Sequence, residues 1–444
     1  MKNSQLNRYY SLPPLLHSAA GNSLSPALYQ KKKITLEKVR YLKMEITKKA
    51  LLVTTVSGFI PQFEMNNVRL LQKMGYEVHY ASNYHTPSYG TDNHRLDGTG
   101  IIRHQIDFVR SPFKVKNITV YRQLRDLMRK EHFDLVHCHT PMGGVMARLA
   151  AHATHTAPVI YTAHGFHFFK GASLINWLCY YPMEWFLSRY TDQQICINQE
   201  DYERAKGSFH AANVDYVSGV GIDHKKIPAR NELLIQKKKQ NLGFPSDKLI
   251  LLSSGELIKR KNHETVIRAI SEIKKRHQDN PDVSVDMLYV ICGHGKLNDY
   301  LKKLVQELHV EDIVTFLGYR EDMMDIYQTA DIFVFPSYQE GLPMSLLEAM
   351  ANGLPVICSD IRGSRDLMGC PLSETGDLEI CQGGIMVKKA DHGEAYCEAI
   401  QYLFDNKTTL RKLGEANALR SRDFSIEVVS KMMERVYGRM GDKH

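Results

Sequence analysis

Short hydrophobic runs alternate with amphipathic stretches of helical length along the chain from Lys49 onward. A short apolar run bounded by turn residues predicts a buried strand, whereas apolar positions three or four residues apart predict a helix. The pattern predicts strands at Ala50–Val56, Tyr76–Ser82, Ile101–Val109, Asp134–His139, Pro158–Ala163, Gln193–Ile197 and Val214–Val217, and helices at Phe63–Met74, Ile118–Lys130, Gly143–His152 and Leu174–Arg189. Such alternation is typical of a doubly wound parallel sheet, which binds ligands beyond the carboxyl ends of its strands.

The same alternation restarts after a polar segment. Gly219–Asp223 and the lysine-rich stretch that runs to Lys239 are interpreted as a junction between two domains. Beyond it we expect strands at Leu249–Ser253, Leu288–Cys292, Val314–Leu317, Ile332–Phe335, Val356–Cys358 and Ile385–Val387, and a final helix at Ile426–Arg439. A length of 444 residues also favours two hydrophobic cores over one. The expected fold is therefore α/β, with Rossmann-like domains at 48–218 and 219–425 and a C-terminal helix within 426–444.

Residues 331–360 are the most informative stretch. A helix at Met344–Ala351 is expected between two buried strands, so its N-terminus lies at the carboxyl edge of the sheet. Free amide groups and the positive end of the helix dipole attract a phosphate there. Glu340 in the preceding loop and Glu348 in the helix flank this position, and carboxylates accept hydrogen bonds from sugar hydroxyls. Taken alone, two glutamates fit a solvated helix face equally well.

Composition and charge exclude several classes of protein. The net charge of +8 is uneven, because residues 1–47 hold eight Lys or Arg against two Glu and so carry +6. The body carries +2, which argues against a nucleic-acid-binding fold. The eight cysteines are scattered without a CxxC pair, which favours a reducing compartment over a disulfide framework. No run of 18 apolar residues occurs, so no membrane-spanning helix is expected.

Residues 1–47 lack sustained periodicity and an apolar signal-peptide core. Met44 and the residues after it look like the start of an ordinary chain, so we interpret 1–47 as a basic extension without regular structure. Whether this extension belongs to the natural protein is left open by the sequence. An alternative is that Lys31–Met44 forms a basic helix that rests on anionic lipid.

Glycines and cations follow other predicted strands. Gly58 ends the first strand, and Gly255 and Gly293 close strands of the second domain, where a missing side chain lets the backbone approach a ligand. Arg260 and Lys261 come just before a predicted helix, so cations and a helix N-terminus converge on a site suited to a diphosphate. The dinucleotide fingerprint GxGxxG is absent, which argues against a dehydrogenase.

Three histidines follow or lie in strands of the first domain. His164 ends a strand that faces the expected cleft, where it either caps the strand or hydrogen-bonds a ligand. His137 and His139 occupy alternating positions of one strand, so both side chains point to one face as metal ligands would. We favour a structural role for this pair, because neither a third ligand nor a carboxylate partner is evident.

The segments Pro-Ser, Glu-Gly-Leu-Pro, Leu-Leu-Glu-Ala-Met-Ala and Gly-Leu-Pro-Val follow one another in residues 336–356. Their order closely resembles the donor-site signature of the retaining glycosyltransferases of family 4. The resemblance covers roughly residues 48–440 and implies the GT-B architecture of two Rossmann-like domains facing a cleft, the first on the acceptor side and the second binding the nucleotide sugar. It also implies that the final helix crosses back onto the first domain. Two positions depart from the family pattern. Gly58 is followed by Phe59 instead of a second glycine, and Glu256 stands where the family usually has Arg, which leaves the details of phosphate binding open.

The resemblance implies roles for the matching residues. His164 would lie near the transferred sugar, Lys261 would neutralise the leaving group, and Arg362-Gly363 is a further candidate loop at the cleft. Catalytic residues are then expected at His164, Glu340 and Lys261, and donor-binding residues at Gly58, Gly255, Arg260, Lys261, Gly293, Tyr319, Arg320, Glu340, Gly341, Leu342 and Glu348. Among these, Glu348 would bind ribose, Glu340 the sugar or diphosphate, and the Tyr319–Arg320 segment the base. No metal or other cofactor is expected.

The implied reaction moves a sugar from a nucleoside-diphosphate donor to a glycan or lipid-linked acceptor, with retention, in exopolysaccharide or capsule synthesis. The implied location is cytoplasmic, with a second option of association with the inner face of the membrane. Arg110–Lys116 and Trp177–Arg189 mix basic and aromatic residues as bilayer-contacting segments do, although a buried helix explains the second equally well. The sugar, base, acceptor, linkage and oligomeric state are left open.

Two alternatives remain. A nucleotide-sugar 2-epimerase shares the two-domain form and would turn over the nucleotide sugar without an acceptor. A binding or scaffold protein with a decayed donor site is suggested by Glu256 and would not bind nucleoside diphosphates.

Overall fold

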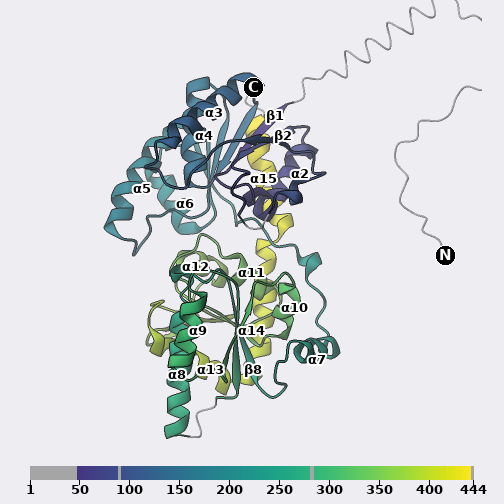
Figure 1. Cartoon of the computed structure of the whole chain (residues 1–444), viewed down its shortest axis with the longest axis vertical. Helices are drawn as coiled ribbons and strands as arrows, with labels where there is room; N and C mark the ends of the chain where they lie inside the picture. The colour runs from purple at the N-terminus through teal and green to yellow at the C-terminus, as the bar shows by residue number, and fades with distance from the viewer. Residues whose placement is uncertain (1–47, 89–91, 281–284, 442–444) are drawn as a thin grey trace, which may run out of the picture. The chain divides into compact units, whose positions relative to one another are not determined.

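The computed structural model describes residues 48–88, 92–280 and 285–441 (Figure 1). The predictions for residues 1–47, including the helix at Lys31–Met44, fall outside the described residues. The rest folds into two lobes, each built on its own sheet. No helix in the described ranges is both long and apolar enough to cross a membrane.

The first lobe contains a seven-stranded parallel sheet in the order β3-β2-β1-β4-β5-β6-β7. Its strands are β1 (Lys49–Val53), β2 (Glu77–Ser82), β3 (Ile102–Gln105), β4 (Leu135–His139), β5 (Val159–Ala163), β6 (Gln193–Cys196) and β7 (Asn213–Tyr216). The connecting elements are η1 (Ile60–Glu64), α2 (Met65–Lys73), η2 (His94–Leu96), α3 (Lys116–Glu131), α4 (Pro141–Thr154), α5 (Leu174–Leu187), η3 (Ser188–Tyr190) and α6 (Gln199–Ser208). In α3, Val120, Leu124 and Met128 recur every four residues and are all buried, which is the periodicity that predicts this helix.

The second lobe contains an eight-stranded sheet in the order β10-β9-β8-β11-β12-β15-β14-β13. Its strands are β8 (Leu249–Ser254), β9 (Met287–Cys292), β10 (Val314–Gly318), β11 (Ile332–Phe335), β12 (Val356–Ser359), β13 (Ser373–Thr375), β14 (Leu378–Cys381) and β15 (Gly384–Val387). The helices that follow β7 along the chain are η4 (His224–Lys226), α7 (Glu232–Asn241), η5 (Lys259–Lys261), α8 (His263–Asp279), α9 (Asn298–Glu307), α10 (Met323–Thr329), α11 (Met344–Ala351), α12 (Arg362–Met368), α13 (Gly393–Asp405), α14 (Lys407–Arg420), η6 (Ser421–Phe424) and α15 (Ile426–Gly441), the last of which belongs to the first lobe.

Helices cover both faces of each sheet, as the near-continuous apolar strands require (Figure 1). In the second lobe, one core lies between the sheet and helices α8, α9 and α13, and the other includes residues of α10 and α11. In the first lobe, α3 and α4 contribute to one core, and α2 and α15 contribute to the other. The predicted α/β class with two doubly wound sheets is confirmed.

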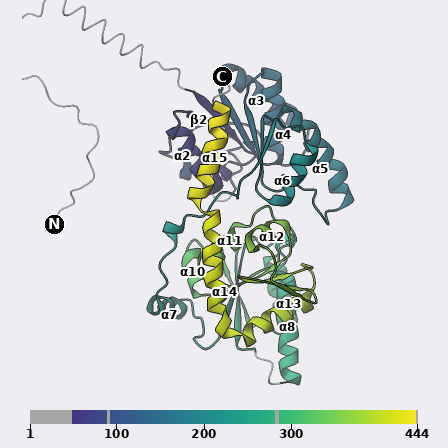
Figure 2. The same ribbon diagram turned by 180° about the vertical axis from the view of Figure 1, so that it is seen from behind.

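The final helix returns from the second lobe to the first. α15 packs beside α2, which both views show (Figures 1 and 2). Its Tyr437 is buried, and the hydroxyl lies 2.8 Å from Nδ1 of His137 on β4. The last element of the chain therefore completes the core of the first lobe.

Several boundaries differ from the predictions. β1 ends at Val53, three residues earlier than expected, and β3 covers only Ile102–Gln105 of the predicted Ile101–Val109. The lysine-rich stretch is not a linker throughout, because it forms α7, which packs against α10. The Asn231 side chain caps this helix, and Lys238 forms an ion pair with Asp325 of the second lobe. Because its composition is polar, α7 was not predicted; this short surface helix is anchored by one buried residue and by charge pairs.

Candidate active site between the two lobes

Two loops of the second lobe bring three charged side chains together. Lys261 Nζ lies 2.9 Å from Oε1 of Glu340, and Arg260 Nη1 lies 2.5 Å from the same oxygen. The cations come from η5, which follows β8, and the carboxylate comes from the loop between β11 and α11. Because β8 and β11 are adjacent parallel strands, their carboxyl ends open at the same edge of the sheet.

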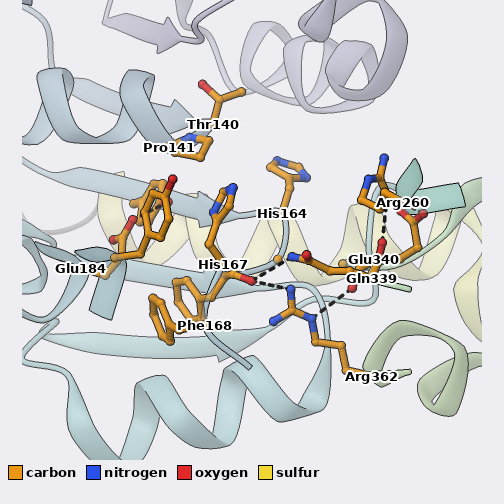
Figure 3. Close-up of a pocket in the computed structure, with 15 residues that line it drawn as sticks. Thr140, Pro141, His164, His167, Phe168, Glu184, Arg260, Gln339, Glu340 and Arg362 are labelled. Carbon is orange, nitrogen blue, oxygen red and sulfur yellow. Dashed lines mark hydrogen bonds and ion pairs between the residues drawn. The ribbon is translucent and has the colours of Figure 1, made fainter. Parts of the chain in front are cut away.

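Main-chain hydrogen bonds hold these two loops in register. The amide of Tyr338 donates to the carbonyl of Arg260 over 2.9 Å, and the Arg260 guanidinium donates to the carbonyl of Gln339 over 2.9 Å (Figure 3). Asn262 has a left-handed backbone with φ of 55°, a conformation that Asn tolerates better than most residues. Its side-chain amide donates to the carbonyl of Pro336 over 3.1 Å. The relative positions of the three charges are therefore set by the backbone.

The two cations determine the charge state of Glu340. Burial alone would raise the pKa of this carboxyl, but the charges of Lys261 and Arg260 outweigh it and hold the pKa below the ordinary value. Glu340 is therefore ionised near pH 7, and the three side chains together carry one net positive charge. Lys261 Nζ also lies 5.0 Å from the centre of the Phe335 ring, within range of a cation–π contact.

A cavity of about 400 Å³ lies between the loops of the two lobes (Figure 3). From the second lobe it is lined by Arg260, Gln339, Glu340, Gly341 and Arg362, and from the first by Thr140, Pro141, Tyr161, His164, Gly165, Phe166, His167, Phe168, Tyr180 and Glu184. The lobes approach closely here, because a Cβ on Gly341 would lie 2.2 Å from the carbonyl oxygen of His164. A glycine is required at this contact.

His164 lies where the sequence places it, directly after β5 and at the cavity wall. Its Nε2 lies 3.1 Å from Nδ1 of His139 and 3.7 Å from Oε1 of Glu64. Burial lowers the pKa of His164 to about 4, so its imidazole is neutral near pH 7. His137 is engaged elsewhere, with Tyr437 and with Thr162.

Glu348 lies on α11, outside the lining of this cavity. The Tyr327 hydroxyl is 3.0 Å from its Oε2 and also 3.0 Å from the Ser254 hydroxyl at the end of β8. Burial raises the pKa of Glu348, and the hydrogen bond with Tyr327 opposes this only in part. The carboxyl group therefore stands at the carboxyl edge of the second sheet, held by a tyrosine.

The predicted glycines serve two different purposes. Gly255 and Gly293 lie side by side after β8 and β9, and a Cβ on Gly293 would lie 1.8 Å from the carbonyl oxygen of Gly255. They keep the carboxyl edge of the second sheet free of side chains. Gly58 instead faces the chain itself, because a Cβ there would lie 1.5 Å from the carbonyl oxygen of Ser88. The close approach of Ser88 therefore explains why position 58 is a glycine, without any contact to a ligand.

Besides Glu348, the predicted residues Lys261, Leu342, Tyr319 and Arg320 lie outside the cavity lining. Leu342 is buried and packs against Gly219 at the junction between the lobes, so its contribution to a ligand is limited to its backbone. Tyr319 is 72% exposed beside the end of β10. Arg320 forms a two-pronged ion pair with Asp322 at 2.6 and 2.8 Å. Glu256 is exposed, while Arg260 pairs with Glu340.

Comparison with known proteins identifies the family. The model of glycosyl transferase 4-like proteins matches residues 49–198, and the model of glycosyl transferases group 1 matches residues 235–420. EpsD of Bacillus subtilis, which carries the name of a glycosyltransferase, is 34% identical over 383 residues, or 86% of this chain and 93% of the relative. The chain belongs to glycosyltransferase family 4. The predicted class of enzyme is confirmed.

One further relative of this glycosyltransferase and one solved structure are informative. The UDP-Gal:alpha-D-GlcNAc-diphosphoundecaprenol alpha-1,3-galactosyltransferase of Escherichia coli is 30% identical over 266 residues, or 58% of this chain and 67% of the relative. Anabaena HepE, solved in complex with UDP and glucose, has a similar fold, with a TM-score of 0.68 and 16% identity over 88% of this chain and all of that one. The expected GT-B architecture is confirmed.

Sequence reasoning missed a buried ion pair in the first lobe of this glycosyltransferase. Arg148 Nη2 donates to Oε2 of Glu184 over 2.8 Å, and the Tyr161 hydroxyl donates to the other oxygen over 3.1 Å. Arg148 is fully buried and stacks on the Tyr161 ring at 4.0 Å. Glu184 and Tyr161 form part of the cavity wall. The only hint in the sequence is that Glu184 is an acidic residue within a helix rich in aromatic residues.

Arg362 joins the lobes at the floor of the cavity. Its guanidinium donates to the carbonyl of Phe166 over 2.6 Å and to the carbonyl of Glu340 over 3.0 Å (Figure 3). It also donates to Oδ1 of Asp201 over 2.6 Å. One side chain thus touches the loop after β5, helix α6 and the loop before α11. The partner Asp201 lies on a helix that the sequence pattern did not predict.

Proposed function

We propose that this glycosyltransferase moves a sugar from a nucleoside-diphosphate donor to a hydroxyl of a glycan or lipid-linked glycan, with retention of configuration, in the assembly of a polysaccharide. The observation that carries the proposal is the meeting of Lys261, Arg260 and Glu340 at the N-terminal end of α11. Two cations, one carboxylate and free helix amides suit a sugar diphosphate, because the cations and amides attract phosphate while the carboxylate accepts sugar hydroxyls.

The chemistry follows from this arrangement. The bond between the anomeric carbon and the diphosphate oxygen breaks, and the diphosphate leaves with the electron pair. Lys261, Arg260 and the amides of Gly341 and Leu342 stabilise its developing charge. The acceptor oxygen bonds to the anomeric carbon from the same face and gives its proton to a phosphate oxygen. Each preorganised electrostatic contact of this kind typically contributes about 2.7–4 kcal/mol. Charge stabilisation by these groups needs no metal ion.

Other residues position the donor in this proposal. Glu348, held by Tyr327, binds the ribose hydroxyls, and the segment Tyr319–Arg320 meets the base through its backbone. Neutral His164 hydrogen-bonds the transferred sugar near the anomeric carbon. The UDP and glucose in the HepE complex support a nucleotide-sugar donor for this fold. The name of the E. coli relative, which specifies a GlcNAc-diphosphoundecaprenol acceptor, supports a lipid-linked acceptor here.

Contact with the membrane surface is part of the proposal. Leu174, Ile175 and Leu178 at the start of α5 are 71–80% exposed. Phe113 and Val115, 87% and 82% exposed, lie between the cations of Arg110–Lys116. Apolar side chains interleaved with lysines favour an anionic bilayer surface. By contrast, Trp177 of the predicted second segment packs against the core of the first lobe.

A panel of nucleotide sugars tests the function. The purified chain is incubated with each donor, with and without a membrane extract, and the released nucleoside diphosphate and the labelled acceptor are measured. We expect one donor to give acceptor-dependent transfer with the anomeric configuration retained. Conversion of the donor without an acceptor would instead identify an epimerase. If calorimetry detects no binding of any nucleoside diphosphate, the chain is a scaffold and the proposal is wrong.

A further inference from the structure

We propose that Glu64, His139 and His164 form a binding site for one divalent transition-metal ion, with zinc as the best match. The inference goes beyond the proposed transfer reaction, whose leaving group is stabilised by cations of the second lobe. It rests on three side chains that approach one another in the first lobe, from η1, from the end of β4 and from the loop after β5.

The distances between the ligand atoms fit a small ion. Oε1 of Glu64 lies 3.7 Å from Nδ1 of His139 and 3.7 Å from Nε2 of His164, and the two nitrogens are 3.1 Å apart. A circle through three points with these separations has a radius of about 2.0 Å, the length of zinc bonds to histidine nitrogen and carboxylate oxygen. An ion at its centre would contact all three atoms without any rearrangement of the backbone.

The charge of the ligand set suits a cation. The side chains of Glu64 and His139 are only 3% and 1% exposed. Within the described residues, Glu64 contacts His139, His164 and Asn67, and it has no ion pair with Lys or Arg. A bound divalent cation would compensate the charge of an ionised carboxylate in this buried place. Two histidines and one glutamate are also the protein ligands of several catalytic zinc sites.

The surroundings are organised as the outer shell of a metal site. The Asn67 side-chain amide donates to Oε2 of Glu64 over 2.6 Å, which leaves Oε1 directed at the histidines. The Phe59 ring packs against His164 and His139, with ring centres 4.9 and 5.7 Å away. Since His164 also lines the cavity, a fourth position on the ion would be accessible to water or a sugar hydroxyl.

His137 provides a matched control. Its ring centre lies 4.1 Å from that of His139, yet its two nitrogens are engaged by Tyr437 and Thr162. The geometry therefore excludes it from the ligand set, although it is a buried histidine on the same strand.

Titration with Co²⁺ and Zn²⁺ tests the site without any sugar substrate, so a negative result would leave the proposed transfer reaction untouched. The full chain is stripped with a chelator and titrated with Co²⁺, and the visible absorption of tetrahedral cobalt is followed. We expect one equivalent to bind and to be displaced by Zn²⁺. Glu64→Gln and His139→Gln should each weaken binding at least about 10-fold, whereas His137→Gln should not.

Equal affinity in the wild type, Glu64→Gln and His139→Gln would place the ion elsewhere and overturn the proposal, as would the absence of saturable binding. If the variants fail to fold, crystals of the wild-type chain soaked in Zn²⁺ decide the question. An anomalous peak between the three ligand atoms is the expected result. If zinc fully occupies other positions in the crystal but gives no peak between these atoms, the proposal is wrong.

Discussion

Arg362 of the second lobe and Asp201 of the first form a 2.6 Å ion pair in which both side chains are at most 2% exposed. Removal of one partner from a buried pair leaves an uncompensated charge, which typically costs about 3–5 kcal/mol. Arg362→Met should therefore lower the free energy of unfolding by about that amount, measured by urea denaturation. Arg365→Met is the control, because Arg365 pairs with Asp360 while its side chain stays 42% exposed. If Arg365→Met lowers the free energy of unfolding as much as Arg362→Met does, the buried pair has no special role.

Lys261 should matter for turnover far more than its neighbour Lys259. Both lie in η5, but Lys261 meets Glu340 while Lys259 is exposed. Loss of one preorganised electrostatic contact should lower kcat by about 10²–10³-fold in Lys261→Ala. Lys259→Ala should retain wild-type turnover in the same assay of nucleoside-diphosphate release. Normal turnover by Lys261→Ala would remove it from the proposed mechanism.

Glu348 should affect donor affinity. In Glu348→Gln, the charged hydrogen bonds to the ribose are replaced by weaker ones, each charged bond contributing about 1.5–3 kcal/mol. We expect calorimetry to show nucleoside diphosphates binding about 10-fold more weakly or worse. Glu264→Gln is the control: this side chain of α8 is 36% exposed and pairs with Arg268, so the variant should bind as the wild type does. The same affinity in both variants would show that ribose is held elsewhere.

His263 should make the protein acid-sensitive. Burial, with a smaller effect from Lys261, lowers the pKa of this histidine from 6.5 to about 3, and neither ring nitrogen has a hydrogen-bond partner among the described residues. The unfolded chain therefore binds more protons between pH 3 and 6.5, so stability is lost as the pH falls through that window. Relative to His263→Phe, the wild type should lose about 2 kcal/mol between pH 7 and pH 5. Denaturant unfolding of both proteins at the two pH values measures this difference, and parallel curves would refute it.

The start of α5 should contribute to membrane binding. Transfer of each exposed leucine into a bilayer surface is favourable by about 1.5 kcal/mol or more. The double variant Leu174→Asp, Leu178→Asp should therefore sediment with anionic phosphatidylglycerol vesicles at least about 10-fold less than the wild type. Leu419→Asp serves as control, since Leu419 is 66% exposed but lies on α14 of the second lobe. Equal binding of all three proteins would exclude this surface.

Much of the fold was predictable because its signals are local. The buried strands at Ile332–Phe335 and Leu249–Ser254 are continuous apolar runs, and the helix at Met344–Ala351 is bounded by Pro343 and Gly353. Elements without such a signal were missed. The polar helices α6 and α7 are stabilised by contacts with the rest of the fold, which the local sequence does not reveal. The β13–β14 hairpin is an antiparallel addition to a parallel sheet.

The sequence by itself determined the alternation of strands and helices, the loop that carries Glu340 and the family to which these patterns belong. Hydrophobic periodicity and helix-terminal residues act over a few positions, so they can be read along the chain. Only the tertiary structure decided which distant side chains meet. The contact of Lys261 with Glu340, the bridge from Arg362 to Asp201 and the gathering of Glu64 with two histidines arise from strand order and lobe packing. No local pattern encodes these contacts, because each depends on the positions of separate elements in space.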